Sequence, residues 1–130
     1  MENTLKKFQE RSKEVLFRHK SILDIITKLD ETNAKINRAV VKTVTSCGCV
    51  EIHAKKQEIP MDISLDDLSD LMKNHIDGHI CPICQDKIQE EIGNHIFYLF
   101  ALANTLDINL EKTIEDEYNK INTLGKYSLF

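Results

Sequence analysis

The sequence contains no tryptophan, only two prolines and only four glycines in 130 residues, and aromatic residues make up 6% of the chain. Proline and glycine interrupt helices and supply turns, so their scarcity predicts long helices rather than a sheet with many tight turns. Hydrophobic residues make up 42% of the chain, which is enough to bury a core. We therefore expect one all-α domain that spans residues 1–130.

The chain also lacks a long hydrophobic run and an excess of basic charge. Its most apolar stretch, residues 96–106, is about half the ~20 residues that a membrane-spanning helix needs, so we expect no membrane partner. Residues 1–20 contain no signal-peptide core, which predicts a protein that stays in the reducing cytoplasm. The net charge is −4 and no basic stripe is present, so nucleic acid is not an expected partner.

The sequence does contain two close pairs of cysteines, Cys47 with Cys49 and Cys81 with Cys84. Zn²⁺ takes four tetrahedral ligands, so two such pairs supply a complete site and staple the chain between them into a loop. On an unbroken helix, residues 47 and 49 would point about 200° apart. Because Gly48 lowers helix propensity, we expect the helix to break there and both thiols to face one ion.

Two histidines leave the ligand set open. His53 lies one turn after Cys49, and His79 lies two residues before Cys81. If the first helix stays intact, the alternative zinc ligands are Cys49, His53, Cys81 and Cys84. Without metal, the cysteines would be reduced thiols that pack as small hydrophobic residues, or they would form a redox disulfide.

Hydrophobic periodicity predicts the helices. The first amphipathic helix, 5–16, is expected to continue or kink into a second run, 22–29. Residues 30–33 are then expected to end this helix, before another helix that leads into Cys47. Ser64 and Asp67 form a capping box that predicts a short helix over residues 65–75, buried through Leu68, Leu71 and Met72. A final helix is expected over 110–122, and the apolar tail, 124–130, is expected to dock on the body or on a second subunit.

The helix that follows the second cysteine pair is predicted to form the core. Apolar residues recur along it at helical spacing, at Ile88, Ile92, Ile96, Leu99, Ala103 and Leu106. His95 lies among them, and we expect it to be a hydrogen-bonded core histidine rather than a metal ligand.

Residues 90–99, 101–104 and 107–111 resemble the MazG-like family of all-α nucleotide pyrophosphohydrolases, and residues 33–56 resemble it more weakly. The resemblance implies a helical bundle in which a Glu-x-x-Glu on one helix and a Glu-x-x-Asp on the next hold Mg²⁺. In that family the metal bridges the triphosphate and activates the water that cleaves between the α- and β-phosphates. Hard carboxylate oxygens suit this task because they bind Mg²⁺ and the metal neutralises phosphate charge.

This sequence retains only half of the acidic pattern. Glu91 matches the second pair but Asn94 stands in place of its aspartate, and Glu51 remains in the first pair while Gly48 replaces its partner. Two carboxylates in place of four predict weak Mg²⁺ binding. By the resemblance, Glu51 and Glu91 are the candidate catalytic residues, and Asn94 and Lys120 are the candidate cofactor-binding residues.

The sequence therefore predicts an all-α, MazG-like helical bundle that forms a homodimer, with a zinc-stapled loop and a degenerate magnesium site. The leading function is a pyrophosphohydrolase relative with reduced or lost activity, retained as a nucleotide-binding or regulatory module. The alternatives are a zinc-stabilised interaction module and a thiol or metal sensor. If the two helices run antiparallel with Glu51 level with Glu91, Cys84 lies seven residues, or about 10 Å, toward the far end of Glu51's helix, away from Cys47. Three arrangements would resolve this conflict: the segment around Cys81 folds back, the helix breaks at Gly48, or the cysteine pairs meet across a dimer interface.

Overall fold

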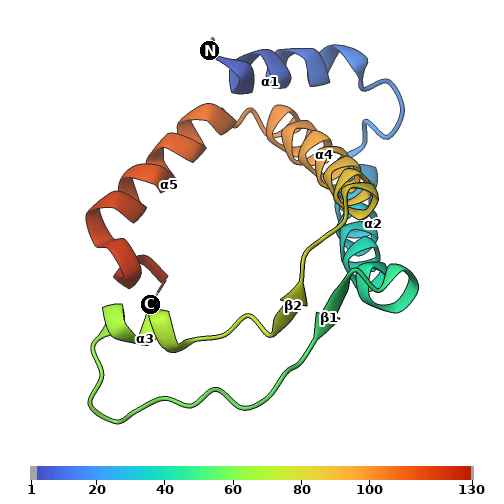
Figure 1. The fold of residues 1–130 in the computed structure, drawn as a ribbon. Coiled ribbons are helices and arrows are strands. Elements are labelled where there is room, and N and C mark those ends of the chain that lie inside the picture. Colours follow the sequence, from blue (N-terminus) through green and yellow to red (C-terminus); the bar gives the residue numbers. More distant parts are fainter. Residues whose placement is uncertain (1–2, 130) are drawn as a thin grey trace.

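The computed structural model describes residues 3–129, which form helices and one two-stranded ribbon that follow one another around a ring (Figure 1). In chain order the elements are α1 (Thr4–Val15), α2 (Ile22–Lys42), a π-helical turn η1 (Thr43–Cys47), β1 (Val50–Ile52), α3 (Leu65–Leu71), β2 (Ile76–Gly78), α4 (Pro82–Thr105), α5 (Leu110–Leu124) and a 3₁₀ turn η2 (Gly125–Leu129). The mostly helical architecture confirms the predicted all-α class, whereas the ribbon was not predicted.

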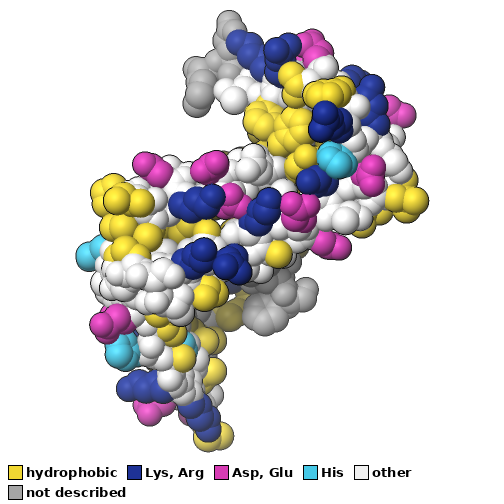
Figure 2. All heavy atoms as spheres, turned by 90° about the vertical axis from the view of Figure 1, so that its right-hand side faces the viewer, with side chains coloured by type: hydrophobic (Ala, Val, Ile, Leu, Met, Phe, Trp, Pro, Cys, Tyr) yellow, Lys and Arg dark blue, Asp and Glu magenta, His cyan; other side chains and the backbone are white. Residues whose placement is uncertain are grey.

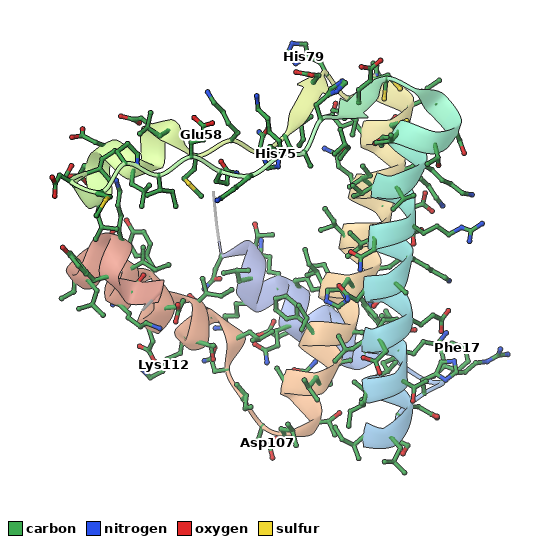
Figure 3. The ribbon with its side chains drawn as sticks, turned by 90° about the horizontal axis from the view of Figure 1, so that it is seen from below. Phe17, Glu58, His75, His79, Asp107 and Lys112 are labelled. Carbon is green, nitrogen blue, oxygen red and sulfur yellow. The ribbon has the colours of Figure 1, made fainter. Side chains whose placement is uncertain are left out.

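The two longest helices, α2 and α4, lie side by side and run in opposite directions (Figures 1 and 3). Ile25 and Ala39 of α2 are buried, as are Ala101 and Ala103 of α4. Small alanine side chains let the two helix backbones approach closely. This pair forms the centre of the fold and carries the second cysteine pair at the start of α4.

Helix α1 packs across α4 near the turn that leads to α5. The Phe8 and Phe100 rings lie 4.7 Å apart between their centroids. The side chain of Gln9 donates to the carbonyl of Ile108 at 2.7 Å and accepts from the backbone N–H of Leu110 at 3.1 Å. This one amide therefore satisfies backbone groups of the α4–α5 connection and fixes where α5 begins.

Helix α5 leads away from the α2–α4 pair, and its far end meets α3 through η2, so the elements follow one another around a ring in Figure 1. The ammonium of Lys126 lies 2.9 Å from the carboxylate of Asp66. This contact agrees with the expectation that the tail docks on the body, although Phe130 lies outside the described residues. Among their described residues, α3 and α5 bury none.

The predicted break at residues 30–33 is wrong, because α2 runs through it without interruption. Glu31 makes ion pairs within the helix, with Lys28 at 3.1 Å and Lys35 at 3.0 Å. Thr32 is buried, and its hydroxyl bonds to the helix backbone. The polar side chains that suggested a turn thus find ion-pair and hydrogen-bond partners within the helix. The helical structure is interrupted between α1 and α2 instead.

The short helix predicted over residues 65–75 is present but ends at Leu71. The N-cap half of the predicted capping box is confirmed, since the Ser64 hydroxyl accepts from the backbone N–H of Asp67. Burial through Leu71 and Met72 is not seen, because each is 43% exposed. The helix is shortened because the segment that follows must extend to pair with β1.

The long helix α4 is the central element, as predicted, but its apolar stripe is only partly covered. Phe100 and Ala103 are buried, whereas Ile92, Ile96 and Leu99 are 40%, 37% and 40% exposed. Within one chain, α4 packs mainly against α2 and α1. The expectation that this apolar stripe packs into the core is therefore met only in part within a single chain.

Candidate metal centre

The first cysteine pair lies where α2 stops. The α-helix gives way to the π-helical turn η1, which ends at Cys47, and Gly48 then adopts a left-handed conformation with φ 78°. Glycine is favoured here because the left-handed region carries a steric penalty for residues with a Cβ. The predicted break at Gly48 is confirmed, and it lets Cys47 and Cys49 face the same side.

The second pair opens helix α4. Cys81 is the N-cap of this helix, and Pro82 occupies its first turn, where a missing N–H is tolerated. The backbone N–H of Cys84 lies 3.4 Å from the Cys81 sulfur. The helix start therefore orients both thiols of this pair toward the end of η1.

The four cysteine sulfurs come together within one chain. One ligand atom from each of Cys47, Cys49, Cys81 and Cys84 lies within 4.8 Å of the others. The Cys47 and Cys81 sulfurs are 3.8 Å apart. A zinc ion with sulfur at about 2.3 Å in a tetrahedron requires sulfur–sulfur edges of about 3.8 Å, so the donor set and its spacing fit zinc.

The ribbon between the two pairs holds them at this distance. Strands β1 and β2 are antiparallel, and Val50 is paired with Gly78. Gly78 has φ 87°, and a Cβ on it would lie 2.7 Å from the carbonyl oxygen of Cys49. Only glycine permits this close approach of the two strands directly beside the cysteines.

The thiols of the second pair differ in acidity. The backbone N–H of Cys84, followed by its thiol, stabilises the thiolate of Cys81 and lowers its pKa to about 7. The neighbouring Cys81 sulfur and then burial raise the pKa of the Cys84 thiol to about 12. Four adjacent thiolates repel one another, so full deprotonation requires a cation such as Zn²⁺.

Neither candidate histidine belongs to the cysteine cluster. The ring of His53 lies 2.9 Å from the Glu51 carboxylate and 3.4 Å from that of Asp77. The hydrogen bond that the His53 ring donates to Glu51, and then the charge of Asp77, raise the pKa of His53. His79 points away from the helices in Figure 3. The ligand set that the geometry supports is therefore the four cysteines.

The structure does not bring the predicted acidic residues together. Glu51 is exposed on β1, two residues after Cys49. Glu91 is buried on α4, seven residues or about 10 Å along that helix from Cys84. The two carboxylates therefore lie on opposite sides of the cysteine cluster. Asn94 is exposed on α4, and Lys120 is exposed on α5 beside Glu117 at 3.5 Å. The expected pairing failed because residue 51 follows the helix break and lies on a strand.

A cavity of about 450 Å³ between α2 and α4 contains Glu91 and was not predicted from the sequence. Four basic side chains line it, together with apolar groups and two of the cysteines: Lys35, Arg38, Ala39, Lys42, Ser46, Cys47, Ile83, Cys84, Lys87 and Glu91. The 3.6-residue spacing of its three α2 cations is the signal that would have indicated a basic face.

The Glu91 carboxylate in this cavity is 8% exposed and lies 3.2 Å from the ammonium of Lys87. A buried carboxylate needs such a partner because desolvation of an unpaired charge is costly. Among the residues that line the cavity, Glu91 is the only acid.

Comparison of the chain with known protein families, curated proteins and solved structures gives no match to any of them. Within residues 3–129, no helix has both the length and the apolar character that crossing a membrane requires.

Proposed function

We propose that this chain is a zinc-stabilised relative of the MazG-like family that has lost pyrophosphohydrolase activity and serves in the cytoplasm as a nucleotide-binding or regulatory domain. The observation that carries the zinc part of the proposal is the cluster of four cysteine sulfurs within 4.8 Å of one another. The nucleotide-binding part rests on the resemblance and on the basic cavity between α2 and α4. A zinc ion held by four thiolates has no open position for substrate, so its role is structural. The reducing cytoplasm suits such a site because the thiols must stay reduced.

The surroundings of Glu91 support the loss of hydrolysis. The carboxylate is neutralised by Lys87, and the other charged side chains that line its cavity are basic. Mg²⁺ binds through several oxygen ligands, and neighbouring cations oppose its binding. A catalytic magnesium site would need at least one further carboxylate, and Glu51 lies outside this cavity.

Two measurements on the purified chain test this proposal. Elemental analysis should give about one zinc per chain. A panel of nucleoside triphosphates with Mg²⁺ or Mn²⁺ should give no pyrophosphate release. The Asn94→Asp variant should remain inactive, because it restores only the pair with Glu91 while Glu51 of the other pair lies on β1, outside the Glu91 cavity. Robust pyrophosphate release by the natural chain would contradict the proposal.

The exposed apolar side chains of α5 favour a second candidate, a zinc-stabilised module for protein interactions. Ile114, Tyr118 and Ile121 lie on one face of that helix and are 45%, 63% and 47% exposed. A thiol or metal sensor is the third candidate, because oxidation of the cysteines would release zinc. These candidates predict no nucleotide binding, which separates them from the leading proposal.

We also propose that the functional unit is a homodimer. The chain exposes 10241 Å², whereas a folded monomer of its mass, 15.0 kDa, is expected to expose about 7,000 Å². The excess of about 3,000 Å² per chain, or about 6,000 Å² over two chains, corresponds to the largest obligate homodimer interfaces, which bury about 5,000 Å² or more in total. A second copy that covers α5 and the stripe on α4 would bury these apolar side chains.

Sedimentation of the purified chain tests the dimer. We expect the mass of two chains, and we expect the Tyr118→Lys/Ile121→Lys variant to sediment as a monomer because each lysine places a charge in the apolar interface. The matched control is Asn119→Lys/Thr123→Lys, which adds the same charge on the opposite face of α5 and should stay dimeric. A monomeric natural chain, or equal dissociation of both variants, would contradict this.

A further inference from the structure

The cavity between α2 and α4 is basic although the chain as a whole is acidic, with a net charge of −4. Four cations line it against one carboxylate. Figure 2 shows Lys and Arg side chains gathered on this face of the molecule. Charge of one sign, concentrated in a hollow on a protein of the opposite sign, indicates an anionic ligand.

Two of the four cations already have partners. Lys35 pairs with Glu31 at 3.0 Å, and Lys87 pairs with Glu91 at 3.2 Å. The side chains of Arg38 and Lys42 make no hydrogen bond or ion pair with any described residue. They lie four residues apart on α2, so both side chains project from the same face of the helix.

The cysteine cluster does not account for both of these cations. A zinc ion with four thiolates carries a net charge of −2, and Lys42 is close enough along the chain to offset part of it. Arg38 is nine residues from Cys47, or about 13 Å along the helix, which exceeds the screening length of about 8 Å at physiological salt. Arg38 is therefore available to another anion.

The cavity also has an apolar side. Ala39 is buried in its wall, and Ile83 is 82% exposed at its edge. An exposed isoleucine beside a row of cations offers a contact for a flat or apolar group attached to the anion. The volume of about 450 Å³ falls in the range of small-molecule sites.

From these features, we infer that the α2–α4 cavity binds a di- or triphosphate group directly through Arg38 and Lys42, without a divalent metal. Guanidinium and ammonium groups replace the metal as the charge partner of the phosphate oxygens. The inference rests on the proposed nucleotide-binding role and adds its location and its metal independence. The same chemistry occurs in inorganic pyrophosphate and in a nucleoside triphosphate, which differ in what they offer to Ile83.

Calorimetric titration of the zinc-loaded full chain with ATP and with pyrophosphate, in buffer without added Mg²⁺, tests the inference. We expect both to bind. The Arg38→Glu/Lys42→Glu variant should weaken both affinities at least about tenfold, since each charged hydrogen bond contributes about that much. The matched control Lys55→Glu/Lys56→Glu makes the same charge change outside this cavity and should alter affinity less than about twofold. Equal losses in the two variants would overturn the inference.

Two further titrations, one of an Ile83 variant and one with added Mg²⁺, identify the ligand and the role of metal. Ile83→Ser should weaken ATP but leave pyrophosphate unchanged, and no effect on ATP would assign the site to the phosphate group alone and remove the nucleotide from the inference. Added Mg²⁺ should weaken ATP binding because it neutralises the phosphates. Stronger binding with Mg²⁺ would overturn metal independence.

Zinc content separates failure of this inference from failure of the proposed function. The Arg38→Glu/Lys42→Glu variant should keep its zinc, and loss of zinc from it would assign these cations to the cysteine cluster and overturn the inference. Absence of ATP and pyrophosphate binding to a chain that holds zinc would overturn this site and the nucleotide-binding role, but not the structural zinc. A zinc-free natural chain that binds ATP would contradict the proposed zinc role while supporting the cavity.

Discussion

The Thr32 hydroxyl lies 2.8 Å from Nδ1 of His95, and this contact sets the register between α2 and α4. The hydroxyl also lies 2.8 Å from the carbonyl of Lys28, to which it donates, so the Nδ1–H of His95 donates to it. One turn before His95 is Glu91, which consequently lies level with Lys35 on the antiparallel helix. A basic residue therefore stands opposite Glu91, where the resemblance to the MazG-like family had predicted Glu51.

Replacing Thr32 with valine should destabilise the helix pair. The valine keeps the shape but leaves Nδ1 of the half-buried His95 without its partner, which costs about 1–3 kcal/mol in the free energy of unfolding. Thr32→Ser keeps the hydroxyl and should cost less. Denaturant unfolding of both variants measures the difference, and equal stability of the two would show that the contact does not fix the register.

The helix cap at Ser64 and the helix break at Gly48 could be predicted because each depends on a few neighbouring residues. That His95 is hydrogen-bonded could also be predicted, but its partner Thr32, 63 residues away in the sequence, could not. The ribbon could not. Its strands are three residues long and are separated by 23 residues, so nothing local links Val50 to Gly78. Because the ribbon was not predicted, Glu51 was expected on a helix and level with Glu91, whereas it lies on β1.

The exposure of the apolar stripe on α4 could not be predicted from the sequence either. Periodicity shows that Ile92, Ile96 and Leu99 share a face, but it does not show whether the partner of that face lies in the same chain. By contrast, the four cysteines were correctly grouped. Their chemistry allows few arrangements, and two short spacings already fix each pair locally.

Gly48 and Gly78, which both have positive φ beside the cysteine cluster, should differ in how much an alanine substitution destabilises the fold. Gly48 has φ 78° with no atom within 4 Å of a new Cβ, so Gly48→Ala should cost about 1–2 kcal/mol from backbone strain alone. Gly78→Ala also forces the Cβ against the Cys49 carbonyl at 2.7 Å and should cost more. Unfolding monitored by zinc release compares the two, and an equal or milder effect at Gly78 would contradict the strand pairing.

The Lys87–Glu91 pair offers a test of the buried carboxylate. Lys87→Met removes the partner of a side chain that is 8% exposed, and it should cost about 1–3 kcal/mol because the carboxylate is left unpaired. Glu91→Gln removes the charge and should cost less. The double variant should be more stable than Lys87→Met alone, and chemical denaturation of all four proteins completes the cycle.

The pH dependence of the ribbon should follow His53. Its pKa is raised by Glu51 and then by Asp77, so the protonated ring stabilises the folded ribbon. Because the folded pKa lies above the unfolded value, this contribution is complete below about pH 6.5 and is lost as pH rises through the folded pKa. A proton NMR titration should show a lower His53 pKa in Glu51→Gln. The same His53 pKa in the variant as in the natural chain would contradict the contact.

Zinc content measured on the purified full chain under reducing conditions tests the central claim most directly. The four sulfurs of Cys47, Cys49, Cys81 and Cys84 predict about one zinc per chain. The Cys81→Ser/Cys84→Ser variant should lose that zinc together with hydrogen-exchange protection of β1 and β2. A fully folded natural chain without metal, or full zinc content in the double-serine variant, would contradict the account.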